Sequence, residues 1–179
     1  LAHLLCLVAR YDDQGTIQPL IGEKWEMLDG GRSLLVTLRS NVRFSDGEPL
    51  TAEDVRRTFE RAIRFDADSP RAIFATIRGA SDYARGATEH VEGIIVRSKL
   101  QIEIQLSEAL PIYPTLLSDP GAGIVRVVPD AEGGESIIGT GKFLIESSEA
   151  KRVVLARNED YWGGTSTPLD HIEFQTRLT

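Results

Sequence analysis

The chain has few of the residues that build redox, metal or membrane-spanning sites. Its single cysteine, Cys6, rules out an internal disulfide, and the leucines and valine around it predict a buried side chain. The three histidines lie far apart, and none stands at metal-ligand spacing from another. No apolar run approaches the roughly 18 residues that a membrane helix needs. The sequence therefore predicts no metal site, no membrane helix and no cofactor.

The charge balance is acidic. Twenty basic residues against 27 acidic residues give a net charge of −7, which disfavours nucleic acid and anionic membrane surfaces as direct partners. A hydrophobic content of 41% in 179 residues predicts a folded protein with one core or two small subdomains. Residues 1–9 are apolar, suit a short buried helix or strand, and lack the basic leader of a targeting segment. We expect the true N-terminus, with any signal, to lie upstream.

Local patterns predict a hairpin followed by helices. Asp29-Gly30-Gly31 tolerates positive φ and predicts a turn within 27–40. A helix is expected to begin at Thr51, with Asp54 in the capping-box position and Phe59 on its apolar face. Ser69-Pro70 predicts a second helix start, and Gly79 and Gly86 bracket a third, short helix. The apolar stripe of the second helix consists of Ile73, Phe74 and Ile77.

The second half of the chain reads mainly as strands and loops. Apolar residues alternate with polar ones up to Leu106, which predicts a strand with Gln101, Glu103 and Gln105 on a solvated face. Residues 111–141 are rich in proline and glycine and predict loops around a short helix and strand. We expect the boundary between subdomains to fall in this stretch. Three further strands are expected at 143–145, 153–156 and 172–174, with a turn at 161–164 between the last two.

Catalytic motifs are missing. The segment Gly139-Thr140-Gly141-Lys142 is not a phosphate loop, because Ser136 and Phe143 occupy positions where that motif requires glycine and serine or threonine. There is no G-x-S-x-G elbow, and adjacent acidic residues fall at turns or helix caps, where solvation explains them.

Three blocks of residues carry a family resemblance over almost the whole chain. The first runs from Pro19 to Arg61 and includes the segment from Pro49 to Val55. The second joins Val91-Glu92-Gly93-Ile94 to the run from Leu110 to Pro114. The third contains Gly139-Thr140-Gly141, Arg157-Asn158, and Asp160 to Gly164. In this order the blocks resemble the family 5 extracellular solute-binding proteins, the peptide, dipeptide and nickel class that serves ABC transporters.

The resemblance implies a fold and an organisation. It implies a mixed α/β protein, the first-lobe part of a type II periplasmic-binding-protein-like fold, with a mixed sheet flanked by helices. Subdomains are expected at 20–115 and at 1–19 with 116–179, and a second lobe outside this chain. Two departures from the family pattern are Lys142-Phe143, in place of proline and an aromatic residue, and Cys6, in place of tyrosine.

The resemblance also implies a function. The whole protein would capture a peptide, metal chelate or similar solute by closure of two lobes, without chemical turnover, and deliver it to an ABC permease. It would act in the periplasm or outside the cell, with a lipoprotein anchor as one possibility. The alternatives are a sensor domain fused to a transcription regulator or kinase, cytoplasmic in that case, and a hydrolase.

Residues are assigned to two roles. We expect ligand contacts from Cys6, Phe74, Ser118 and Asp119. Structural roles in turns, caps and packing are expected for Trp25, Asp46, Gly47, Thr51, Asp54, Gly139, Gly141, Asn158, Tyr161 and Trp162.

Overall fold

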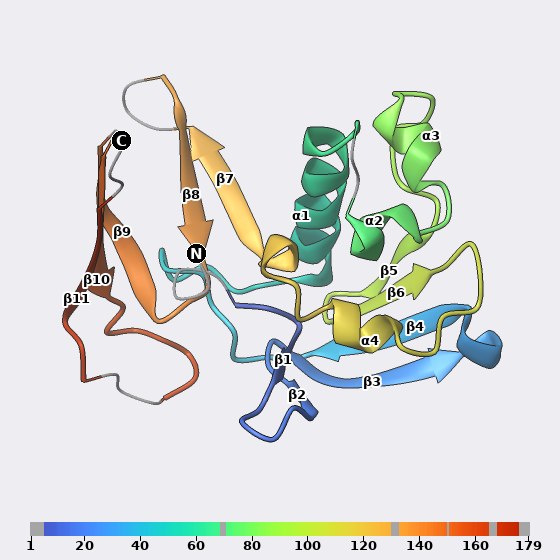
Figure 1. Ribbon diagram of the computed structural model, residues 1–179, viewed down its shortest axis with the longest axis horizontal. Coiled ribbons are helices and arrows are strands. Elements are labelled where there is room, and N and C mark those ends of the chain that lie inside the picture. Colours follow the sequence, from blue (N-terminus) through green and yellow to red (C-terminus); the bar gives the residue numbers. More distant parts are fainter. Residues whose placement is uncertain (1–5, 69–70, 130–132, 150, 165–167, 176–179) are drawn as a thin grey trace. The chain divides into compact units, whose positions relative to one another are not determined.

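The computed structural model describes residues 6–68, 71–129, 133–149, 151–164 and 168–175. The chain forms two compact units (Figure 1), and each of them is assembled from more than one stretch of sequence. Unit 1 comprises Leu1–Cys6, Asn41–Leu50 and Val125–Thr179. Unit 2 comprises Leu7–Ser40 and Thr51–Ile124. The subdomains expected within the first lobe, at 20–115 and at 1–19 with 116–179, remain a prediction, and the compact units divide the chain at different points.

Unit 2 is built on a four-stranded sheet with the strand order β3-β4-β6-β5. All of its pairings are antiparallel, so the expectation of a mixed sheet is wrong for this sheet. For two of the three pairings the reason is local, because short turns connect β3 to β4 and β5 to β6, and such turns require antiparallel partners. The strands are β3 (Gly22–Leu28), β4 (Ser33–Leu38), β5 (Ile94–Ser98) and β6 (Gln101–Gln105).

The predicted hairpin is confirmed at β3 and β4. The 3₁₀ turn η1 (Asp29–Gly31) joins the strands, with φ of 51° at Asp29, 63° at Gly30 and 92° at Gly31. Only glycine and, less readily, aspartate adopt such angles without strain, which explains the composition of the turn. The apolar face of β4 is fully buried, as expected, at Leu34, Val36 and Leu38.

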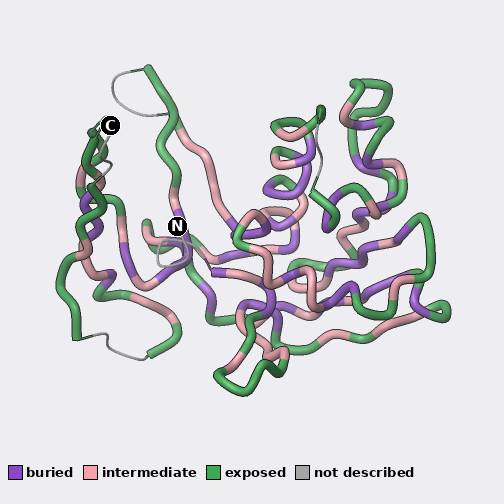
Figure 2. Tube along the Cα trace, viewed as in Figure 1, coloured by how far each residue is buried: buried purple, intermediate pink, exposed green. Residues whose placement is uncertain are grey.

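The same unit contains the helices α1, α2 and α3. The first, α1 (Ala52–Phe65), begins at the predicted capping box and packs on β5 and β6. Figure 2 shows its buried residues along one side of the helix. The others are α2 (Ala72–Ala75) and α3 (Ala80–Ala84). Phe59 of α1 and Phe74 of α2 meet edge to face, with 5.3 Å between ring centroids.

The second helix is shorter than its apolar stripe suggested. The chain leaves the helix at Thr76, and Ile77 forms an isolated bridge with Leu106. Ile77 is therefore buried in a sheet-like pairing and not on a helix face. Over so short a stretch, both arrangements give the same spacing of apolar residues in the sequence. The start signal at Ser69-Pro70 lies outside the described residues.

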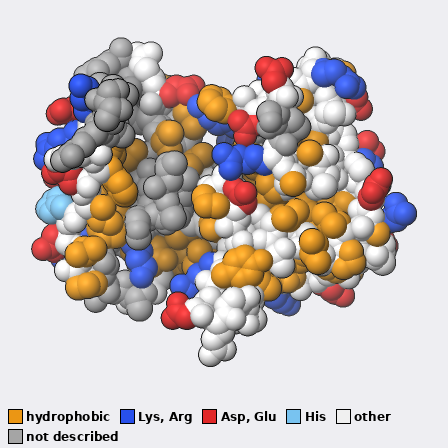
Figure 3. All heavy atoms as spheres, viewed as in Figure 1, with side chains coloured by type: hydrophobic (Ala, Val, Ile, Leu, Met, Phe, Trp, Pro, Cys, Tyr) orange, Lys and Arg blue, Asp and Glu red, His pale blue; other side chains and the backbone are white. Residues whose placement is uncertain are grey.

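The rest of unit 2 consists of short elements. Strands β1 (Ala9–Tyr11) and β2 (Ile17–Pro19) pair with each other. Leu7 and Val8 before them form neither helix nor strand, and the same holds for Cys6 of unit 1. The stretch before β7 contains α4 (Tyr113–Leu116) and the 3₁₀ turn η2 (Pro120–Ala122). Hydrophobic side chains gather over the part of this unit that holds α4 (Figure 3), where Ile112 is 61% exposed.

Unit 1 contains two small antiparallel sheets. One is a three-stranded sheet in the order β11-β10-β9, and the other pairs β7 with β8. The three strands expected near the C-terminus are confirmed, and each is longer than its sequence pattern. The core of the larger sheet consists of Phe143 and Leu155. The strands are β7 (Val125–Pro129), β8 (Glu135–Gly139), β9 (Phe143–Glu149), β10 (Arg152–Arg157) and β11 (His171–Gln175).

Glu103 departs from the strand pattern. Alternation placed it on a solvated face, but it is 7% exposed. Its carboxylate accepts hydrogen bonds from Ser33 Oγ at 2.8 Å, Gln105 Nε2 at 2.8 Å and Arg97 Nε at 2.7 Å. Burial opposes ionisation, but these three donors outweigh it and hold the pKa of the Glu103 carboxyl below its ordinary value. A buried ionised carboxylate thus links β4, β5 and β6.

The capping box at the start of α1 gives a first prediction. Thr51 Oγ1 accepts from the amide of Asp54, and the Asp54 carboxylate accepts from the Thr51 amide at 2.9 Å. We expect Thr51→Ala to lower the free energy of unfolding by about 1 kcal/mol, as measured by urea denaturation of the full-length protein. Ser81→Ala, at an exposed position inside α3, is the control. Equal stabilities of the two variants would contradict the role of the cap.

The Glu103 network gives a second prediction, which concerns the pH dependence of stability. Because the folded pKa lies below the unfolded one, the stabilisation is complete above the unfolded pKa, about 4.3, and is lost as pH falls through the folded pKa. Glu103→Gln should therefore cost about 1–3 kcal/mol at pH 7 and progressively less in acid. Urea denaturation at pH 7 and pH 3 measures this, with Glu26→Gln on an exposed position of β3 as control. A cost that does not change with pH would refute it.

Candidate functional site

Two segments of unit 1, one at Ser45 and one at Asn158 to Trp162, donate hydrogen bonds to the backbone of residues 139–141, here called the Gly-Thr-Gly anchor. The carbonyl of Gly139 accepts from the amide of Ser45 at 3.0 Å. The carbonyl of Thr140 accepts from Trp162 Nε1 at 2.9 Å, and that of Gly141 accepts from Asn158 Nδ2 at 3.1 Å. The buried carbonyls of this short segment are thereby satisfied by donors that lie far away in sequence. The anchor fixes the loops around it.

Cys6 reaches the same anchor. Its amide donates to Thr140 Oγ1 at 3.4 Å, its thiol donates to the Thr140 carbonyl at 3.3 Å, and its sulfur lies 3.8 Å from the Tyr161 hydroxyl. Burial raises the pKa of the Cys6 thiol, and the hydrogen bonds from its neighbours offset only part of this effect. Cys6 is buried, as its apolar flanks predicted, and at neutral pH it is a protonated thiol and a weak nucleophile.

Tyr161 and Trp162 form an aromatic pair beside the anchor. Both side chains are half-buried, and their ring centroids lie 5.2 Å apart. Lys142 Nζ lies 5.7 Å from the centroid of the Tyr161 ring. At Gly163 a Cβ would come within 2.5 Å of that ring, so a larger residue there would require the Tyr161 side chain to move. The pair therefore presents π surface next to an ammonium group, an arrangement suited to an apolar group or a carboxylate. Sequence reasoning treated both aromatics only as scaffold.

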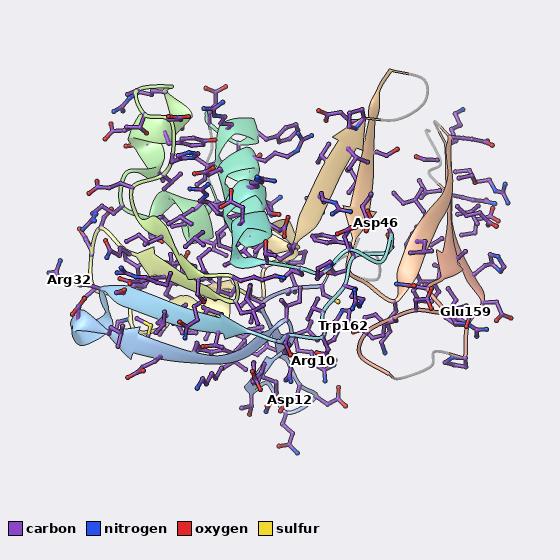
Figure 4. The ribbon with its side chains drawn as sticks, turned by 180° about the vertical axis from the view of Figure 1, so that it is seen from behind. Arg10, Asp12, Arg32, Asp46, Glu159 and Trp162 are labelled. Carbon is purple, nitrogen blue, oxygen red and sulfur yellow. The ribbon has the colours of Figure 1, made fainter. Side chains whose placement is uncertain are left out.

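The Asp46-Gly47 turn is held to strand β7. Asp46 forms an ion pair with Arg126, whose guanidinium also lies 4.9 Å from the centroid of the Phe44 ring. Gly47 has φ of 87°, as the turn requires. Figure 4 shows Asp46 and Trp162 on separate segments. These contacts describe a structural turn. In unit 2, Trp25 is half-buried on β3, opposite Val36 of β4.

The other predicted ligand contacts lie in unit 2. Phe74 is 1% exposed and belongs to the core, and it also lines a pocket of about 400 Å³ between α1, α2 and α3. Ser118 Oγ donates to the Thr115 carbonyl at 2.7 Å. Asp119 accepts from the amide of Gly121 at 2.6 Å and pairs with Arg71 at 3.2 Å. Ser118 and Asp119 thus make contacts within their own unit, and a role for any of these residues in ligand binding remains a prediction.

Among the residues that the structure describes, no three histidine, cysteine, aspartate or glutamate side chains gather closely enough to hold a metal ion. Within the same residues, no helix has both the length and the apolar character needed to cross a bilayer.

Comparison with known families decides the identity. The model of the bacterial extracellular solute-binding proteins, family 5 Middle, matches residues 16–177. The chain belongs to this family. The match confirms the resemblance noted from the three sequence blocks, and it includes the Gly-Thr-Gly anchor, the Asn158 to Gly164 segment and most of unit 2.

Several curated relatives are named as binding proteins. A probable deoxycholate-binding periplasmic protein, YgiS of Escherichia coli, is 30% identical over 91% of this chain and 32% of its own length. The periplasmic oligopeptide-binding protein OppA of Salmonella typhimurium is 26% identical over 91% of the chain and 32% of its length. The nickel-binding periplasmic protein of E. coli is 27% identical over 87% of the chain and 29% of its own length. The chain spans about a third of the length of these relatives.

Solved structures support the fold class. The unliganded open form of the murein tripeptide-binding protein MppA matches with a TM-score of 0.82 and 25% identity, over 97% of this chain and 35% of that one. Listeria monocytogenes OppA bound to peptide matches with a TM-score of 0.81 and 19% identity, over 98% of this chain and 37% of that one. This match shows a likeness of fold alone. The expected mixed α/β class and partial periplasmic-binding-protein fold are therefore confirmed.

The environment of Cys6 gives a third prediction. We expect an aromatic disulfide reagent at pH 8 to modify Cys6 of the folded full-length protein at least about tenfold more slowly than in denaturant, because burial disfavours the thiolate. Mass spectrometry of the Cys6 peptide reports the rate. Trp162→Ala, which removes a neighbour of the Thr140 carbonyl, should speed the reaction, and Trp25→Ala in unit 2 should not. Rapid labelling of the native protein would show that Cys6 is a reactive thiol.

Proposed function

We propose that the protein containing this chain is a non-catalytic solute receptor of an ABC transporter. The observation that carries the proposal is the family match over residues 16–177. The relatives described above are named for binding deoxycholate, oligopeptide and nickel. The sensor alternative is not favoured, because these names describe periplasmic binding proteins. The same relationship supports a periplasmic or extracellular location and delivery to a permease as parts of this proposal.

The ligand is proposed to be a peptide or another small amphipathic solute. Family relationship supports a peptide, since the murein tripeptide-binding and oligopeptide-binding proteins are among the relatives. The local chemistry is compatible, because Tyr161, Trp162 and Lys142 offer aromatic surface and a positive charge. Cys6, Phe74, Ser118 and Asp119 remain the proposed ligand-facing residues. The rest of the ligand's surface would be enclosed by polypeptide outside this chain, as closure of two lobes requires.

Binding without turnover is the mechanism that fits the site best. A thiol whose pKa is raised by burial is unsuited to nucleophilic attack, and the polar groups of the anchor are already paired with one another. Such a site can orient and desolvate a solute, and lobe closure then supplies the remaining contacts. Chemistry on the bound solute is not part of this proposal.

A ligand panel tests the proposal. The full-length protein is heated with tripeptides, longer oligopeptides, a nickel–histidine complex and deoxycholate, and its unfolding temperature is recorded. A ligand at about 100 times its Kd stabilises the folded state by about 2.7 kcal/mol, which raises the midpoint by several degrees. We expect at least one class, with peptides first, to give such a shift. Mass spectrometry after prolonged incubation should recover that ligand intact.

Two outcomes would overturn the proposal. One is progressive cleavage of a panel member by the pure protein, which would indicate an enzyme. The other is the absence of any shift with all four classes, together with no small molecule retained by protein purified under gentle conditions. For a ligand that shifts the unfolding temperature, Trp162→Ala tests whether the aromatic pair contributes to binding. Trp25→Ala in unit 2 is the aromatic control.

A further inference from the structure

The outer face of α1 carries a concentrated positive charge on an otherwise acidic protein. Arg57, Arg61 and Arg64 stand at i, i+4 and i+7, a spacing that places all three on one side of a helix. All three are exposed. Phe65 follows them and is 87% exposed, the highest exposure among the large hydrophobic residues of the described chain. These four residues are here called the α1 arginine face.

A shallow groove lies along this face. Its volume is about 490 Å³, and it is lined by the four residues of the α1 arginine face together with Glu60 and Tyr83. The guanidinium carbon of Arg64 lies 4.4 Å from the centroid of the Tyr83 ring, so part of the wall is held in place by a cation–π contact. The groove thus combines arginine forks with aromatic surface.

Two acidic side chains, Glu60 and Glu53, lie near the groove. Glu60 is buried, and its carboxylate faces His90 Nδ1 at 3.2 Å and accepts from the amide of Val91 at 3.1 Å. Glu53 is shared between Arg56 at 2.6 Å and Arg57 at 3.1 Å. Arg57 is 70% exposed in its contact with Glu53, and such surface pairs contribute little, so it can exchange one carboxylate for another at small cost. Three arginines line the groove against one acidic residue, the buried Glu60.

The chemistry of the groove favours one class of partner. Arginine forks bind carboxylates in a bidentate manner, and arginine and aromatic residues dominate the energetics of protein interfaces. A long polyanion or an anionic membrane would meet the net charge of −7 beyond this one helix, which disfavours both. We propose that the α1 arginine face is a docking surface for an acidic segment of a partner protein, with Phe65 as its apolar anchor.

A defined probe tests this proposal separately from solute binding. The sequence Glu-Glu-Leu-Glu-Glu-Phe is displayed on a surface loop of an inert folded carrier protein, which is too large to be enclosed as a solute. Biolayer interferometry with the full-length protein should show binding that weakens as salt increases. The triple variant R57E/R61E/R64E should lose at least about tenfold in affinity. F65A should bind several-fold more weakly, with an unchanged salt dependence.

A matched control uses three exposed basic residues elsewhere in unit 2: Lys24, Arg32 and Lys99. Figure 4 shows Arg32 at the far end of the β3–β4 hairpin. The variant K24E/R32E/K99E changes the net charge by the same amount and should bind the carrier like the wild type. Equal losses in both triple variants would overturn the proposal, and so would equal binding of a carrier whose loop has Gln in place of Glu.

Other occupants are separate outcomes of the experiment. Tighter binding to vesicles rich in phosphatidylglycerol, or to single-stranded DNA, than to the carrier would overturn the proposal in favour of those partners. Should the charge-reversed α1 unfold, seen as lost helical circular dichroism, R57Q/R61Q/R64Q decides: weaker carrier binding supports the proposal and wild-type binding contradicts it. Solute binding measured on the same variants keeps the two proposals apart, because the α1 arginine face is not part of the proposed solute contacts.

Discussion

The buried carbonyls of residues 139–141 impose the constraint on which unit 1 depends. Each must find a donor, and the donors come from Ser45, Trp162 and Asn158, three positions far from the anchor in sequence. Since an unpaired buried carbonyl costs about as much as a lost hydrogen bond, the surrounding loops are held together or lost together. The spacing of the Gly-Thr-Gly and Asn-x-x-Tyr-Trp motifs is explained by this need, without any catalytic role.

Unit 2 depends on a different interaction, the packing of α1 against an antiparallel sheet. The apolar side of the helix is buried on β5 and β6 and against α2, while its opposite side bears arginines. One helix therefore serves two purposes, with its inner face stabilising the scaffold and its outer face available to a partner. Solute capture and docking are assigned to different surfaces, so a change in one need not disturb the other.

The sequence predicted well those features that are set by neighbouring residues. The capping box at Thr51 and the glycine turn at Asp29–Gly31 depend on a few adjacent positions, and both occur as expected. Features set by distant partners were missed. Burial of Glu103 depends on Ser33 and Arg97, which alternation along one strand cannot reveal. The half-exposed aromatic surface beside Cys6 likewise depends on a contact across 155 residues, between Cys6 and Tyr161. Burial of Cys6 itself was visible because its immediate flanks are apolar.

This chain is proposed to supply part of a solute-binding wall and to make or break no bonds. The most direct test is a crystal structure of the full-length protein with its co-purified or panel-derived solute. We expect an unaltered solute enclosed between residues of this chain and polypeptide outside it. A cleaved or covalently attached product, or a solute with no contact to residues 1–179, would contradict it.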